Sequence, residues 1–224
     1  AGWAGRISSV TSTPNGSCTA GLNNVPTPEW CMSGGSNPGT EAGAFGSLPR
    51  SIAVDPSRSM LYVADFSSHR IQKFSTSGSY VGWRGVVGVT GPTGGDANCN
   101  VTTQGDPTPG WCVGGMAQAA TGNTLGFSGP AALAIDSSNS NLYISDSGNY
   151  RVVRYDITSS DYTGWIGRVG TTVPTGGDPG CTSTTTGTLT PGWCLGGAAQ
   201  AGAQSIGFSG LRGLALSPTH LYAY

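Results

Sequence analysis

The sequence repeats itself at an interval of roughly 81 residues, and this period constrains the fold more than any other feature. The unit reads FSGPAALAIDSSNSNLYISDSGNYRVVRYDITSSDYTGWIG at 127–167 and FGSLPRSIAVDPSRSMLYVADFSSHRIQKFSTSGSYVGWRG at 45–85, and it begins again at Phe208. Independent markers keep the same interval, namely Trp3, Trp83 and Trp165, and Cys31, Cys112 and Cys194. This agreement indicates duplication of one unit.

Each unit contains short apolar runs separated by clusters of turn residues, which is the pattern of β-strands. The expected strands lie at 51–54, 61–64, 70–74 and 80–83, and again at 132–135, 142–145, 151–155 and 162–166. No stretch of useful length carries an amphipathic helical pattern. We therefore expect an all-β fold of four-stranded sheets, arranged radially as the blades of a β-propeller.

The unit resembles the NHL repeat, which is the blade of NHL β-propellers. The matching residues are Phe45, Pro49, Asp55, Tyr62, Asp65, Arg70 and Phe74, and in the second copy Phe127, Pro130, Asp136, Tyr143, Asp146, Arg151 and Tyr155. The third copy departs from this pattern, because Gly210-Leu211-Arg212 carries no proline and Ser217 replaces the first aspartate. The resemblance implies a propeller built from these blades, here an incomplete set.

Some NHL-type propellers are lyases that hold a central metal through histidines. This chain has two histidines, His69 and His220, which do not repeat and do not match those ligands. They also form no Ser-His-Asp set with the scattered serines. We therefore expect no catalytic residues, no metal and no cofactor.

The period also divides the chain into the segments of one repeat array. The expected segments are an outer strand of a preceding blade (1–7), blades (45–85 and 127–167), the start of a third blade (208–224), and connectors (8–44, 86–126 and 168–207). Propellers close with about four to eight blades. The chain is therefore expected either to belong to a longer repeat protein or to assemble from several copies.

Each connector carries two cysteines separated by 13 residues. The pairs are Cys18 and Cys31, Cys99 and Cys112, and Cys181 and Cys194. One pair per repeat at fixed spacing predicts three local disulfides, whereas zinc would need C-x-x-C pairs or nearby histidines. Because disulfides persist in oxidising compartments, we expect an extracellular or cell-surface protein.

A tryptophan precedes the second cysteine of each connector, in the sequences Pro28-Glu29-Trp30-Cys31, Pro109-Gly110-Trp111-Cys112 and Pro191-Gly192-Trp193-Cys194. Two interpretations stay open for Trp30, Trp111 and Trp193. They cover the disulfides as small cores of their loops, or they are exposed platforms for sugar or protein. The connectors of a propeller gather on one face, so we expect the disulfide loops to form the binding face.

Asp65 and Arg70 flank one short turn, and Asp146 and Arg151 flank its repeat. Such a pair most simply holds its turn together through charge-assisted hydrogen bonds. The alternative is a polar lining of a central channel, with or without a cation. The oxygen-rich segment 136–141 (DSSNSN) lacks the glycine and glutamate of an EF-hand loop, so calcium is not expected there.

Two sequons, at Asn15 and Asn100, mark possible glycosylation sites. Charged residues make up only 9% of the chain and the net charge is −1, so no basic stripe points to nucleic acid. No apolar run is long enough to insert into a membrane.

These features suggest three classes of function. The first is a binding or adhesion module for a protein or carbohydrate ligand. The second is a structural repeat protein of a surface layer or fibre, which self-assembles from identical subunits. A propeller enzyme is the third and has least support, because no catalytic constellation accompanies the repeats.

Overall fold

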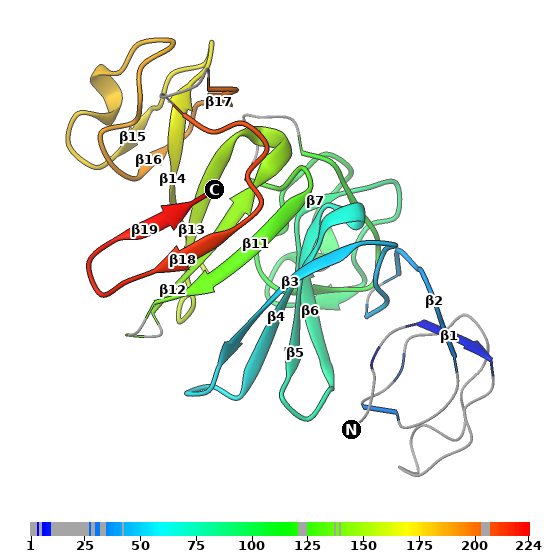
Figure 1. The fold of residues 1–224 in the computed structure, drawn as a ribbon. Helices are drawn as coiled ribbons and strands as arrows, with labels where there is room; N and C mark the ends of the chain where they lie inside the picture. The colour runs from blue at the N-terminus through cyan, green and yellow to red at the C-terminus, as the bar shows by residue number, and fades with distance from the viewer. Residues whose placement is uncertain are drawn as a thin grey trace.

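The computed structural model of the protein describes residues 4, 6–9, 27, 30–31, 35–41, 43–120, 125–136, 138, 140–202 and 207–224. The fold is all-β, as the sequence predicted, and its strands form several open sheets (Figure 1). Within the described ranges the only helical elements are 3-10 turns of three residues. No helix in that part of the chain is long and apolar enough to span a bilayer.

Two four-stranded antiparallel sheets form the body of the molecule, and we call them the first and second blade. The first contains β3 (Pro49–Asp55), β4 (Met60–Asp65), β5 (Arg70–Ser75) and β6 (Tyr80–Arg84). The second contains β11 (Pro130–Ile135), β12 (Asn141–Asp146), β13 (Arg151–Asp156) and β14 (Tyr162–Val169). The predicted strands of both units are therefore confirmed, with the observed strands extending past the apolar runs.

The elements on either side of the blades are smaller. A two-stranded sheet of β18 (Leu214–Leu216) and β19 (Leu221–Ala223) forms the third copy of the repeat. Near the N-terminus, β1 (Arg6–Ser9) pairs with β2 (Gly35–Asn37) in a sheet of its own. Short 3-10 turns, η2 (Phe66–Ser68) and η4 (Ser147–Asn149), occupy the same turn of the first and second blade.

The connectors extend the blades, which corrects the expectation of a separate face of disulfide loops. In the first sheet the strand order is β3-β4-β5-β6-β9-β8, where β8 (Gly94–Gly95) and β9 (Cys112–Val113) come from the connector. β15 (Gly176–Gly177) and β16 (Cys194–Leu195) extend the second sheet in the same way. An outer strand offers unpaired backbone groups, and a chain that folds back can pair with them.

Further short strand pairings hold the connectors in place. β7 (Val86–Val87) pairs with β10 (Ala117–Gln118), and β17 (Ala199–Gln200) pairs with the end of β14. Two more 3-10 turns, η3 (Cys99–Val101) and η5 (Cys181–Ser183), each begin at the first cysteine of a pair. These glycine-rich segments therefore adopt the same ordered structure in both repeats.

The main core lies between the two blades. Strand β11 packs against β3 and β4, and β18 packs in turn against β11, so the first strands of successive repeats lie side by side (Figure 1). One apolar cluster joins Ala53, Tyr62, Ala64, Ile71 and Trp111 with Leu133, Leu142, Ile144, Val153 and Tyr155 of the second blade. Successive side chains of a strand point to opposite faces, so each blade presents one face to each neighbour.

Candidate functional site

Two of the predicted disulfides, Cys99–Cys112 and Cys181–Cys194, are confirmed. Cys31 is disulfide-bonded as well, whereas Cys18 lies outside the described residues. Each described disulfide packs against a fully buried tryptophan of the outer strand, Trp83 or Trp165, which lies directly opposite the second cysteine. The disulfides therefore fasten the connectors to the blades.

The two outer-strand tryptophans are also hydrogen-bonded. The indole N–H of Trp83 donates to the carbonyl of Gly114 at 2.8 Å, and Trp165 donates to Gly196 at the same distance. Gly114 and Gly196 have positive φ values of 68° and 64°, which favour glycine. The first glycine of the Gly-Gly pair after Cys112 and after Cys194 thus accepts the hydrogen bond of the indole.

This arrangement corrects the expected role of the tryptophans that precede the cysteines. Trp111 is one residue away from Cys112, so its side chain points to the other face of the extended sheet, away from the disulfide. There its ring lies 5.6 Å from that of Tyr62, and Trp193 lies 5.6 Å from Tyr143. Gly82 makes room for Trp111, because a side chain there would meet the Trp111 backbone at 2.9 Å.

Trp111 is not an exposed platform, since only 7% of it is accessible. Its indole N–H donates to Ser160 Oγ of the second blade at 3.1 Å, so it bridges two repeats. Trp30, partly buried, donates to the carbonyl of Thr76 in the corresponding turn of the first blade. Trp193 is also partly buried. Trp30 and Trp111 therefore join neighbouring repeats, whereas the ring contacts of Trp193 are with Tyr143 and Arg154 of its own repeat.

A cationic side chain lies beside the tyrosine and the connector tryptophan in each of the two repeats. Ala53, Tyr62, Lys73 and Gly82 lie directly across neighbouring strands, and their counterparts are Ala134, Tyr143, Arg154 and Gly164. Lys73 Nζ lies 5.2 Å from the centre of the Trp111 ring, and the guanidinium of Arg154 lies 4.5 Å from that of Trp193. Sequence reasoning missed these cations, although the register of paired strands would have aligned them.

The aspartate–arginine pairs form buried ion pairs across η2 and η4. Arg70 Nε donates to Asp65 at 3.0 Å, and Arg151 Nε donates to Asp146 at 2.9 Å. Arg70 also donates to backbone carbonyls of the incoming connector, namely those of Thr40, Glu41 and Ala44. All four charged side chains are essentially inaccessible to solvent. Their burial favours the role of holding the turn over that of lining a channel.

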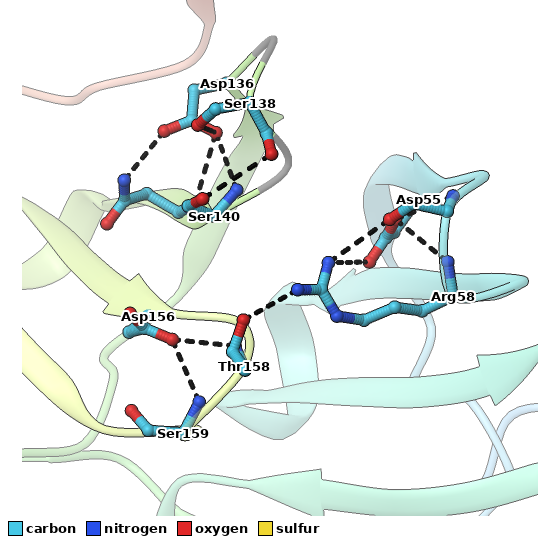
Figure 2. A network of polar contacts seen from close by, with 10 residues as sticks. Asp55, Arg58, Asp136, Ser138, Ser140, Asp156, Thr158 and Ser159 are labelled. Atoms are coloured by element: carbon cyan, nitrogen blue, oxygen red, sulfur yellow. Dashed lines mark hydrogen bonds and ion pairs between the residues drawn. The ribbon is translucent and has the colours of Figure 1, made fainter.

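In the turn between the first two strands of each blade, an aspartate accepts hydrogen bonds from residues of its own turn (Figure 2). Asp136 accepts hydrogen bonds from Ser138, Ser140 and Asn141, so its oxygens are occupied within the segment where calcium was considered. Burial raises the pKa of Asp55, but hydrogen bonds from Ser57 and Arg58 outweigh it and hold that pKa below its usual value. These carboxylates therefore act as turn formers.

The Asp55 turn also reaches the next repeat (Figure 2). Arg58 Nη2 donates to Thr158 Oγ1 of the second blade at 2.6 Å. A second unforeseen contact involves His69, whose Nδ1 accepts a hydrogen bond from the backbone N–H of Gly129 at 3.0 Å. These contacts join residues that are distant in the sequence, so local patterns gave no signal for them.

Of the two sequons, Asn100 is exposed in η3, and Asn15 lies outside the described residues. Within the described part of the chain, no three His, Cys, Asp or Glu side chains gather as a metal site would require. No protein-family model matches the sequence, and no curated protein matches it significantly.

Proposed function

We propose that this chain is an extracellular structural repeat protein, built of β-propeller-type blades that resemble NHL repeats, and that it is not an enzyme. One observation carries the proposal. The residue types that recur in both complete repeats, which are the tryptophans, the cysteines and the Asp–Arg pairs, make contacts within and between repeats. None of these repeated groups converges on a common cavity in the described structure, as the groups of an active site would.

The stacking of the blades supports the propeller-type geometry. Four-stranded antiparallel sheets that face one another, with their innermost strands in succession, are the building plan of propellers. β3, β11 and β18 follow this order. Each repeat contacts its neighbours, so the stability of such an array is a sum of repeat and interface contributions.

The disulfides support the extracellular assignment. Cys99–Cys112 and Cys181–Cys194 recur with the same separation, 13 residues, and both fasten a glycine-rich connector to a blade. Such bonds persist where the surroundings are oxidising. A rigid, sparsely charged scaffold with fastened connectors suits a surface layer or fibre.

Fractionation of the producing cells tests this function. Thiols are blocked before lysis, and peptides that contain Cys99 and Cys112 are mapped by mass spectrometry in each fraction. We expect disulfide-linked peptides in the extracellular or surface fraction. Recovery of the same cysteines as blocked thiols in the cytosolic fraction would contradict the proposal.

A second candidate function is that of a binding or adhesion module. It is favoured by a groove between the connector at 86–126 and the second blade. The groove has a volume of about 660 Å³, and its lining includes the charged residues Arg84 and Asp161 and the aromatic residues Tyr155 and Tyr162. Arrays of glycans and peptides test it. Binding that Asp161→Ala abolishes would support this candidate, and the absence of any bound probe would remove it.

A further inference from the structure

A buried arginine lines the groove between the connector at 86–126 and the second blade. Arg84 ends β6, and only 7% of it is accessible to solvent. Its Nη2 donates to the carbonyl of Pro109 at 3.0 Å, while its Nε N–H is buried and has no hydrogen-bond partner. Because arginine is almost never this deeply buried unless it is paired, the surroundings of Arg84 call for an explanation.

Arg84 differs from the other buried arginines in having no counter-charge. Each of the others pairs with an aspartate, in the pairs Arg70–Asp65 and Arg151–Asp146. Among the described residues, no carboxylate lies within ion-pair distance of Arg84. Its guanidinium lies instead 4.9 Å from the centre of the Tyr155 ring and 5.7 Å from that of Trp111. Ring faces compensate a buried charge less completely than a carboxylate does.

The repeat itself does not require a cation at this position. Ile166 stands there in the second copy, after the same Gly-Trp pair, and Ala4 stands there in the N-terminal Gly-Trp-x-Gly motif. The strand register agrees, because Arg84 and Ile166 each pair with the second residue of the preceding strand. An outer strand therefore forms with an apolar residue at this position, and the buried charge of Arg84 is not needed to build it.

Asp161 supplies the second charge of the groove. It is exposed, and its carboxylate makes no hydrogen bond or ion pair with the described protein. Ser79 stands in its place in the first blade, so this charge is also specific to the groove. Tyr155 and Tyr162 line the same space of about 660 Å³. Binding sites for small molecules combine aromatic walls with a few placed polar groups in this way, and they have volumes of this order.

We propose that this groove binds an acidic saccharide, whose carboxylate or sulfate ester neutralises Arg84 and whose hydroxyl groups donate to Asp161. Arginine forms its strongest hydrogen bonds with oxyanions. An ionised carboxylate only accepts hydrogen bonds, so Asp161 selects donors such as sugar hydroxyls. Tyr162 offers its ring to the apolar face of a sugar. The inference rests on the second candidate function, the binding module, and names its ligand class.

Calorimetric titration with matched sugars tests the ligand class. We expect the trisaccharide of galacturonic acid to bind roughly tenfold more tightly than the trisaccharide of galactose, which lacks the charge-assisted contact. A sulfated galactose trisaccharide is the second acidic probe. Tighter binding of either acidic sugar supports the proposal, and the one that binds identifies the oxyanion. Equal binding of acidic and neutral sugars, or binding of none, would overturn it.

Arg84→Ile gives the chain the residue of the second copy at this position, and it should remove the preference for the acidic sugar. Arg212→Ile, at an exposed position outside the groove, should keep the preference. Without a ligand, Arg84→Ile should be at least as stable in thermal unfolding as the wild type, because an apolar side chain replaces an unpaired buried charge. A clear loss of stability, or a preference that survives, would show that Arg84 is a structural residue and would overturn the proposal.

The ligand class and the functions proposed above fail separately. If the arrays find a neutral ligand whose binding Asp161→Ala abolishes, the binding module stands and the acidic ligand is overturned. The cysteine state found by cell fractionation does not depend on the groove, so the structural function is tested independently.

Discussion

His69 and Tyr150 occupy the same left-handed position after a 3-10 turn, with φ values of 53° and 55°. The histidine places an imidazole there, and the unperturbed pKa of an imidazole is close to neutral pH. Burial lowers the pKa of His69, although Asp146 and Asp65 oppose this effect. The neutral ring is the form that accepts the N–H of Gly129. One side chain therefore makes the contact between the blades sensitive to acid.

Because the folded state holds the pKa of His69 below its unfolded value, the unfolded chain binds the proton more readily. The stabilisation is complete above the unfolded pKa, about 6.5, and is lost as the pH falls below it, with a slope of at most about 1.4 kcal/mol per pH unit. We expect His69→Asn, which tolerates the left-handed backbone, to remove this loss. Thermal unfolding between pH 5 and pH 8 measures it, with His220→Asn as the exposed control. Equal pH slopes for wild type and His69→Asn would contradict the assignment.

Arg151 offers a second test at the scale of one residue. It is buried with Asp146, and it also donates to the carbonyl of Gly126. Arg151→Ala should lower the free energy of unfolding by about 3–5 kcal/mol, since it leaves an unpaired buried carboxylate. Urea denaturation measures the loss. Arg212→Ala, at an exposed position, is the control, and comparable small losses for both variants would show that the ion pair is not structural.

At the scale of elements, the disulfide connector behaves as part of the sheet. The strand after each disulfide pairs with the outermost strand of its blade, and the fully buried Trp83 or Trp165 covers the bond. The connectors contribute little apolar core of their own, because they are rich in glycine, serine and threonine. The crosslink, the tryptophan that covers it and the short strand pairings of the connector therefore hold it in place.

The double variant Cys99→Ser with Cys112→Ser should lose about 3 kcal/mol of unfolding free energy, as expected for a loop of this length. Cys181→Ser with Cys194→Ser should lose a similar amount, because the two connectors share one structure. Chemical denaturation without reductant compares the variants. A loss in one repeat only would mean that the two connectors do not play the same structural role.

At the scale of the whole molecule, one apolar cluster forms the joint between the two blades, and Trp111 lies within it. Trp193 holds the equivalent position one repeat later but is only partly buried. Trp111→Ala should cost about 3–5 kcal/mol through the cavity that it leaves. Trp193→Ala should cost clearly less. Equal losses in urea denaturation would show that Trp111 does not act through the joint.

The period, the all-β class, the strands of both blades and the cysteine pairs of the connectors at 86–126 and 168–207 could all be predicted from the sequence. These features depend on local patterns, namely alternation, turn residues and fixed spacing, which a single repeat displays completely. The Asp65–Arg70 pair belongs here as well, since its partners are only five residues apart.

The position of the connectors and the surfaces that meet between repeats could not be predicted from the sequence. Trp111 and Trp83 look alike in the sequence, but the register of β6 with β9 places Trp83 on the disulfide and Trp111 in the joint. His69, Arg58 and Ser160 each have a partner in the neighbouring repeat. The physical reason is that adjacent residues of a strand face opposite sides. Which side is buried depends on the neighbouring sheet.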